Sequence, residues 1–324
     1  FYKNRPAASF PRPSSGSILP RMKPEIIAYA GWKNCLRLTN GLMELVVTLD
    51  VGPRIIRLAR KGGQNVFKEF SSLCGQTGGD EWKIYGGHRL WHAPEVMPRT
   101  YYPDNYPVQH AWDGITLSLT PPEETTNHLQ LGMDVVMMPD QPSVTVTHRI
   151  TNTGPWPVEL APWCLTVMAE GGRAVVPHET FIPHGERYTP ARALVLWHFT
   201  KMNDPRLVWG EKFIQIREDA SVMQKFKVGA MNTKGWAAYL LQGDVFMKQF
   251  PWISGATYPD IGCNCEFYTE PGMLEIESLG PMSRLEPGGS VEHAEVWCIA
   301  HAEVGEDEAD LARVLGRMVT VSPL

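Results

Sequence analysis

The chain has 324 residues, of which 43% are hydrophobic and 20% charged, with a net charge of −5. This composition supports a sizeable core and excludes an intrinsically disordered chain, and the negative charge argues against a nucleic-acid-binding protein. No apolar stretch approaches the roughly 20 residues of a membrane-spanning helix, so we expect a soluble protein without a membrane partner. The 29 Gly, 27 Pro and 11 Trp favour short strands and many turns over a helical bundle.

Residues 1–24 differ from the rest of the chain because prolines punctuate them. Ser, Gly and Arg stand between Pro6, Pro11, Pro13, Pro20 and Pro24. Such a composition is typical of an extended arm or a leader and not of a folded domain. The first residue is Phe1 and not Met, which suggests a removed leader and therefore a secreted or periplasmic protein. From residue 25 to 324 no linker or repeat interrupts the pattern, so we predict one domain there.

The first predicted strands cover residues 35–49 and 53–58. Asn40-Gly41 divides the first of these stretches, and Asn-Gly is the strongest short hairpin signal. Residues 71–110 then carry many glycines and prolines, together with several Trp and Tyr. We predict a long irregular segment here, and loops of such length inside a compact domain are usually functional.

Strands resume after this segment and outnumber helices heavily. Val144, Val146, His148 and Ile150 alternate with polar residues, so they are expected to share one strand face. The one predicted helix is residues 306–319, where apolar residues recur at helical spacing. The regular strand spacing favours an all-β antiparallel sandwich or barrel with a short C-terminal helix. The further predicted strands are 114–119, 129–138, 143–151, 157–167, 192–199, 212–217, 235–242, 245–250, 263–269, 273–279 and 290–300.

Chemically versatile side chains gather between residues 86 and 95. His88 and His92 suit general acid–base work, Arg89 can hold an oxygen ligand, and Trp91 can stack on a sugar ring. The simpler alternative is that both histidines only hydrogen-bond backbone carbonyls. His88, His92 and Glu95 could instead bind a metal, but the glycines and Pro94 argue against a regular helix and no H-E-x-x-H motif is present. We therefore expect neither a metal nor a cofactor. Glu95 is instead a candidate for substrate binding, and nearby aromatic candidates for sugar contact are Tyr101 and Tyr102.

A second group of candidates lies near the C-terminus. Glu275 and Glu277 project from one face of a predicted strand, and in a dry cleft paired carboxylates raise each other's proton affinity. The alternative is an amphipathic edge strand with two solvated glutamates. Lys248 and Asp260 are secondary candidates, and each taken alone is more often structural.

Six short motifs follow one another along residues 31–300. They are Asn40-Gly41-x-x-Glu44-Leu45, Gly52-Pro53-Arg54-Ile55, His148-Arg-Ile-Thr-Asn152-Thr-Gly154, Glu266-Phe-Tyr268-Thr269, Leu274-Glu275 and Leu285-x-Pro287-Gly288. In this order they resemble the motifs of galactose mutarotase (aldose 1-epimerase) relatives, in a poorly characterised branch. The resemblance implies a β-supersandwich that holds a sugar in a cleft, with a histidine as acid and a glutamate as base. The base maps onto Glu275, with Glu277 beside it and Glu266 in a neighbouring strand.

The family's acid histidine is missing from this sequence. Trp163-Cys164-Leu165-Thr166-Val167 stands where its motif would be, so we hypothesise that His88 or His92 replaces it. The simplest predicted function is an aldose 1-epimerase-like activity on a mono- or oligosaccharide. A glycoside hydrolase or polysaccharide lyase on the same fold is the alternative, and a non-catalytic carbohydrate-binding protein is an alternative of another class.

Overall fold

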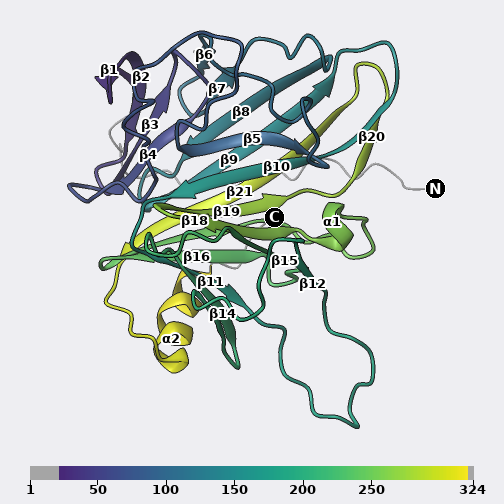
Figure 1. Cartoon of the computed structure of the whole chain (residues 1–324). Helices are drawn as coiled ribbons and strands as arrows, with labels where there is room; N and C mark the ends of the chain where they lie inside the picture. Colours follow the sequence, from purple (N-terminus) through teal and green to yellow (C-terminus); the bar gives the residue numbers. More distant parts are fainter. Residues whose placement is uncertain (1–21, 320–324) are drawn as a thin grey trace, which may run out of the picture.

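The computed structural model describes residues 22–319, which form two antiparallel β-sheets packed face to face (Figure 1). The first sheet has eleven strands in the order β1-β2-β3-β4-β5-β10-β19-β18-β15-β12, with β20 paired to β10. The all-β sandwich that the sequence predicts is therefore confirmed. The strands of this sheet are β1 (Glu25–Tyr29), β2 (Trp32–Thr39), β3 (Met43–Thr48), β4 (Ile55–Arg60), β5 (Gly87–Ala93), β10 (Val158–Met168), β12 (Leu194–Leu196), β15 (Phe226–Ala230), β18 (Cys265–Glu270), β19 (Met273–Leu279) and β20 (Ser283–Leu285).

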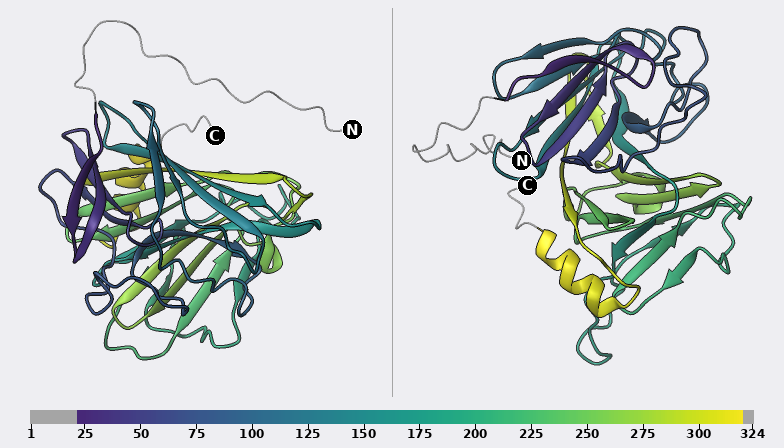
Figure 2. Two further views of the ribbon diagram at one scale, coloured as in Figure 1. Left: turned by 90° about the horizontal axis from the view of Figure 1, so that it is seen from above. Right: turned by 90° about the vertical axis from the view of Figure 1, so that its left-hand side faces the viewer.

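The second sheet has ten strands in the order β13-β14-β11-β16-β17-β21-β9-β8-β7-β6. Two further views show the layers of the sandwich (Figure 2). Val144, Val146, His148 and Ile150 share one buried face of β9, as predicted. The strands are β6 (Gln109–Trp112), β7 (Leu117–Thr120), β8 (Leu129–Met137), β9 (Ser143–Asn152), β11 (Arg173–Pro177), β13 (Leu207–Trp209), β14 (Phe213–Arg217), β16 (Trp236–Leu241), β17 (Asp244–Gln249) and β21 (Ser290–His301).

The main hydrophobic core lies between the sheets, where alternate residues of both sheets meet. In the first sheet, Leu274 and Ile276 of β19 and Phe267 of β18 point into it. Phe246 and Trp297 reach it from the second sheet. Because side chains alternate along a strand, the intervening residues of β18 and β19 project to the other side of the first sheet, which we call its outer face.

Every predicted strand overlaps an observed one, and the predicted hairpin is confirmed. Asn40 Oδ1 accepts hydrogen bonds from the backbone N–H groups of Leu42 and Met43, and Gly41 takes a left-handed φ of 83°. The prediction for residues 71–110 is wrong in one important part, because residues 87–93 form the central strand β5. All seven of its residues are buried, so the strand does not have one buried and one exposed face. The alternation of apolar and polar residues by which half-buried strands are recognised is therefore missing.

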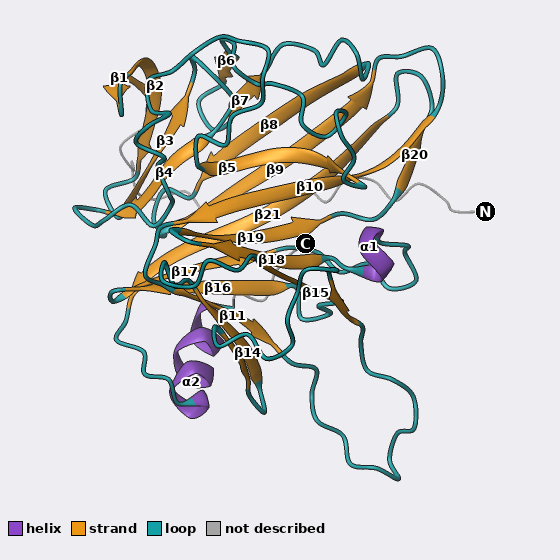
Figure 3. Cartoon of the chain, viewed as in Figure 1, coloured by secondary structure: helices purple, strands orange, loops and turns teal. Residues whose placement is uncertain are grey.

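The two helices lie at the periphery of the sheets (Figure 3). The predicted C-terminal helix is α2 (Glu308–Met318), whose Leu311 and Leu315 pack on the second sheet. α1 (Pro259–Gly262) is a single irregular turn. In the described range neither helix is long and apolar enough to cross a membrane. Most of the predicted N-terminal arm, residues 1–21, lies outside the described residues.

Candidate active site

A group of acidic side chains occupies the outer face of the first sheet. Glu275 and Glu277 extend from β19, and Glu266 of β18 stands directly opposite Glu277 in the antiparallel register. All three are buried, with Glu275 the most exposed at 6%. Besides burial, the nearby charge of Asp260 in α1 raises the pKa of the Glu266 carboxyl group. We call these four acidic residues, together with Lys227 and Arg89, the carboxyl cluster.

Lys227 of β15 joins two members of the carboxyl cluster. Its Nζ lies 2.8 Å from Glu266 Oε2 and 3.1 Å from Glu277 Oε2. The ammonium also stands over the rings of Trp163 and Trp197, 4.7 Å from each centroid, where cation–π attraction adds to the ion pairs. Burial alone would lower the pKa of Lys227, but Glu277 and Glu266 raise it above its ordinary value. Lys227 is therefore a fixed positive charge between two carboxyl groups.

Arg89 of β5 forms the second cationic contact. Both of its Nη atoms lie 3.2 Å from Glu275 Oε1, so one carboxylate oxygen is anchored while the other is not. The guanidinium packs over the rings of Trp91 and Trp82, at 4.4 and 5.4 Å from their centroids. Tyr101 packs edge-on against both tryptophans. Aromatic rings therefore cover this side of the cluster.

Two predicted site residues, Tyr101 and Glu95, extend this aromatic layer. The Tyr101 hydroxyl donates a short hydrogen bond to Glu95, and the charge of Glu95 acts on Asp260. Four polar atoms of the carboxyl cluster are buried without a hydrogen-bond partner among residues 22–319, namely Glu266 Oε1 and Oε2, Glu277 Oε1 and Arg89 Nε. Of these, Glu266 Oε2 still contacts Lys227 Nζ. Such atoms are uncommon in folded proteins, because each costs about 1–3 kcal/mol when it is left unsatisfied. The cluster therefore has unused hydrogen-bonding capacity.

Three carboxyl groups of this cluster, those of Glu266, Glu275 and Asp260, have a pKa above its ordinary value. Burial raises the pKa of Glu266 well above its ordinary value, and the charge of Glu277 adds to the rise while Lys227 opposes it. Burial also raises the pKa of Glu275, against the opposing effect of Arg89, and raises the pKa of Asp260. Glu277 differs in its bonding, because it accepts hydrogen bonds from Trp163 Nε1 at 2.7 Å and from Lys227 Nζ. The outer face of the first sheet thus holds Glu266 and Asp260 as candidate proton donors and Glu275, which Arg89 anchors, as a candidate acceptor.

The structure does not bring His88 and Lys248 to this face. Both side chains point between the sheets into an interior network of His88, His148, His293, Lys248, Glu295, Ser278 and Thr166. His88 Nε2 lies 2.7 Å from His148 Nε2, and His88 Nδ1 lies 2.8 Å from Thr166 Oγ1. Lys248 Nζ lies 2.9 Å from Glu295 Oε1. The hypothesis that His88 acts beside Glu275 is therefore wrong, because consecutive residues of β5 project to opposite faces.

Among the described residues, His, Cys and Glu side-chain atoms with the spacing of metal ligands occur in this interior network. The nearest ring nitrogens of His88 and His148 and an oxygen of Glu295 lie within 4.8 Å of one another. Both Glu295 oxygens are already occupied, however, because Oε1 pairs with Lys248 and Oε2 accepts a hydrogen bond from Trp297 Nε1 at 2.8 Å. The Lys248 ammonium thus supplies the counter-charge that a metal ion would otherwise bring. Burial holds the pKa of His88 well below its ordinary value and that of His293 at about 3.

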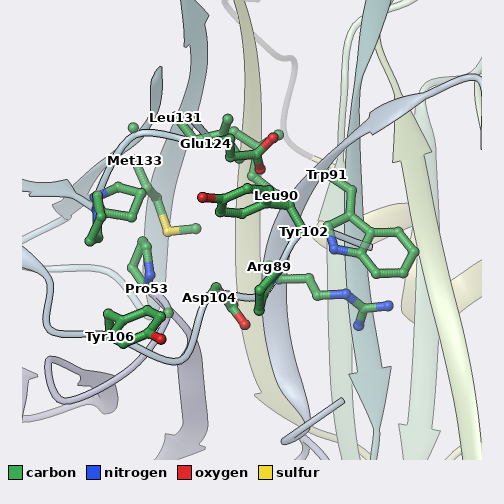
Figure 4. A pocket seen from close by; sticks show the side chains of 15 residues that line it. Pro53, Arg89, Leu90, Trp91, Tyr102, Asp104, Tyr106, Glu124, Leu131 and Met133 are labelled. Carbon is green, nitrogen blue, oxygen red and sulfur yellow. The ribbon is translucent and has the colours of Figure 1, made fainter. Parts of the chain in front are cut away.

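His92 and Tyr102 belong neither to the carboxyl cluster nor to the interior network. They lie in a third region, on the interior side of β5. His92 Nε2 lies 3.4 Å from Glu124 Oε2. Glu124 and Tyr102 line a pocket next to Leu90 (Figure 4). His92 is thus separated from Glu275 by the thickness of the sheet. Like His88, it is not positioned to act beside Glu275.

Sequence reasoning missed Lys227, Trp163 and Trp197. Lys227 and Trp163 are buried in regular strands, and no local motif sets them apart. The signal for Trp163 was nevertheless present, because it stands at the start of the segment that replaces the family's acid-histidine motif. Lys227 stands between Phe226 and Val228 and is the one charged residue of an otherwise apolar strand. Because a buried charge is costly, this feature could have identified it from the sequence.

Comparisons with solved structures identify similar folds at low sequence identity. A TPR-domain containing protein from Parabacteroides distasonis ATCC 8503 matches with a TM-score of 0.61 and 13% identity, over 90% of this chain and 49% of that one. This chain thus spans about half the length of that protein. A candidate aldose 1-epimerase from Escherichia coli K12 matches with a TM-score of 0.52 and 13% identity, over 83% and 99% of the two chains.

A galactose mutarotase-like protein from Lactobacillus casei ATCC 334 matches with a TM-score of 0.51 and 9% identity, over 82% of this chain and 100% of that one. No family model matches the sequence. No curated protein matches it either. At these identities the likeness concerns the fold, and the fold is the one that the sequence motifs predicted. The chain therefore has the galactose mutarotase-like β-supersandwich fold.

Proposed function

We propose that this protein is a carbohydrate-active enzyme that acts at the anomeric centre of an aldose, most simply as a 1-epimerase. The observation that carries the proposal is the carboxyl cluster, where Glu266, Glu275 and Glu277 share one buried face with Lys227 and Arg89. Epimerisation needs one acid and one base on the same side of a sugar. The cluster offers both without either histidine.

In this proposal Glu275 is the base and Glu266 the acid. Glu275 has one oxygen anchored by Arg89, and burial raises its pKa, which makes it a stronger base than a free carboxylate. Burial raises the pKa of Glu266 well above its ordinary value, which favours the protonated form that a donor needs. The charge of Glu277, which Trp163 and Lys227 contact, adds to that rise in the pKa of Glu266.

The reaction then needs only two proton transfers in each direction. Glu275 removes the proton of the anomeric hydroxyl, the bond between the anomeric carbon and the ring oxygen breaks, and Glu266 protonates that oxygen. The open-chain aldehyde rotates about the bond to its carbonyl carbon. The ring closes on the opposite face while the two protons return.

The test is the rate of anomer equilibration, followed by polarimetry or by NMR exchange spectroscopy with a panel of aldohexoses and aldopentoses. Glu275→Gln and Glu266→Gln should each lower this rate at least 100-fold, as expected for the loss of a general base or acid. His92→Asn should leave it within about threefold, because His92 lies on the other side of the sheet. Wild-type rates in both glutamate variants would overturn the proposal.

One observation favours a second candidate, a glycoside hydrolase. The Lys227 ammonium lies 2.8 Å from Glu266 Oε2 and 3.1 Å from Glu277 Oε2. The two oxygens are thus at most about 6 Å apart, a bound that is compatible with the roughly 5 to 5.5 Å between the carboxyl groups of retaining glycosidases. Release of reducing ends from an oligosaccharide panel, lost in Glu277→Gln, would identify this activity. Saturable sugar binding with no turnover in either assay would identify a binding protein instead.

A further inference from the structure

A pocket of about 70 Å³ lies on the interior side of β5, away from the carboxyl cluster. β5 pairs with β4 only at Ile55 and His88, so beyond that point the two strands diverge. Tyr102 and Tyr106 from segment 101–106 flank the pocket, while Leu90 of β5 and Met133 of β8 form its apolar walls. The Arg89 side chain turns away from it (Figure 4).

Two carboxyl groups and one guanidinium group belong to the residues that line the pocket. Arg54 contacts the two oxygens of Asp104 at 2.8 and 3.0 Å, and Arg89 is paired with Glu275. Glu124 also lines the pocket, and among the residues that the structure covers no Lys or Arg forms an ion pair with it. Its Oε2 accepts a hydrogen bond from Asn127 Nδ2 at 2.6 Å and lies 3.4 Å from His92 Nε2. Glu124 is therefore the lining carboxyl group that has neither a Lys nor an Arg partner among the described residues.

His92 adds unused hydrogen-bonding capacity next to that carboxylate. It is 1% exposed, and neither ring nitrogen has a hydrogen-bond partner within residues 22–319. Its Nε2 lies 3.4 Å from Glu124 Oε2. A buried and unpartnered imidazole is costly to the folded state. His92 does not line the pocket itself but lies directly behind Glu124, which does. Glu124 therefore marks the point where a polar group of a ligand would be stabilised.

We propose that this pocket binds the head of a compact organic cation, a protonated or methylated amine with a short apolar body. The ammonium would pair with Glu124 and face the rings of Tyr102 and Tyr106, which attract cations through their π-systems. Leu90 and Met133 would contact the apolar body. Since a water-sized sphere occupies about 10–15 Å³, the pocket has room for about five or six non-hydrogen atoms, which matches a small alkylammonium ion. This inference does not depend on the activity of the carboxyl cluster.

The experiment compares isobutylammonium with isobutanol, its neutral isostere, by isothermal titration calorimetry on the full chain. The ammonium should bind saturably and the alcohol at least tenfold more weakly. Glu124→Gln keeps the side-chain shape and should weaken ammonium binding at least tenfold, and Tyr102→Leu should also weaken it. Glu286→Gln is the matched control, because it removes the same charge from an exposed residue that pairs with Arg284, and it should change nothing.

Three outcomes would overturn the proposal. The first is the absence of saturable ammonium binding to the wild-type chain. The second is equal binding of isobutanol and isobutylammonium, which would make the pocket an apolar site without charge selection. The third is unchanged ammonium affinity in both Glu124→Gln and Tyr102→Leu, which would place the ligand elsewhere. Circular dichroism of each variant verifies that it is folded.

Discussion

Replacing Lys248 by Met tests whether the interior network stabilises the sandwich as one charged unit. Lys248 is fully buried, and its Nζ lies 2.9 Å from Glu295 Oε1. The same atom donates hydrogen bonds to the backbone oxygens of Cys164 and Ile276, both at 3.2 Å. Methionine fills a similar volume but supplies none of these contacts. The variant would leave a buried carboxylate without its cation and two carbonyl groups without this donor.

Removing one partner of a buried ion pair costs about 3–5 kcal/mol, so Lys248→Met should lower the free energy of unfolding by that amount. Urea denaturation at pH 7.5 measures it. The matched control is Lys225→Met, which breaks an exposed ion pair with Glu270 and should cost less than about 1 kcal/mol. The double variant Lys248→Met/Glu295→Gln should be more stable than Lys248→Met, because the unpaired charge is gone. A cost below about 1 kcal/mol for Lys248→Met, or a less stable double variant, would refute this reasoning.

Three further outcomes are expected. Gly87→Ala should destabilise the protein by at least about 3 kcal/mol in thermal unfolding, because its Cβ would lie 2.4 Å from Ile55 O. Gly78→Ala, at a similar positive φ but in open space, should cost only about 1 kcal/mol, and equal costs would contradict the argument. Burial lowers the folded-state pKa of His293 to about 3 from an unfolded value near 6.5, so its contribution to stability is lost as pH falls below 6.5. The stability advantage of wild type over His293→Gln should therefore shrink by about 2 kcal/mol between pH 7.5 and 5 in urea titrations, and an advantage independent of pH would show that His293 does not titrate this way. Glu308→Ala removes the acceptor of three backbone N–H groups in residues 211–213, so amide exchange there should rise, and unchanged exchange would show that the contact is dispensable.

The fold could be predicted from the sequence wherever one strand face is buried and the other is not. β9 is such a strand, and its alternation gave both its position and its inward face. The Asn40-Gly41 turn was equally readable, because the side chain of Asn and the conformational freedom of Gly act locally. These signals require only neighbours in the sequence.

The site was less predictable because it depends on which face of β5 each residue takes. His88, Arg89 and His92 stand together in the sequence, yet Arg89 joins the carboxyl cluster while both histidines face the interior. A strand buried on both sides has no polar alternation to separate its faces. The sequence predicts that Glu266 and Glu277 lie on neighbouring strands. That they stand directly opposite each other depends on the register between β18 and β19, which the sequence does not specify.

The strand order also constrains when the molecule can fold. β10 lies between β5 and β19, and β21 lies between β17 and β9, so the middle of each sheet joins segments far apart in the sequence. Loop closure over such separations slows folding. During synthesis β10 would lack β19 and β9 would lack β21 until residues 273–301 had left the ribosome. The N-terminal half is then a nascent chain with exposed strand edges, which are prone to pair with other chains.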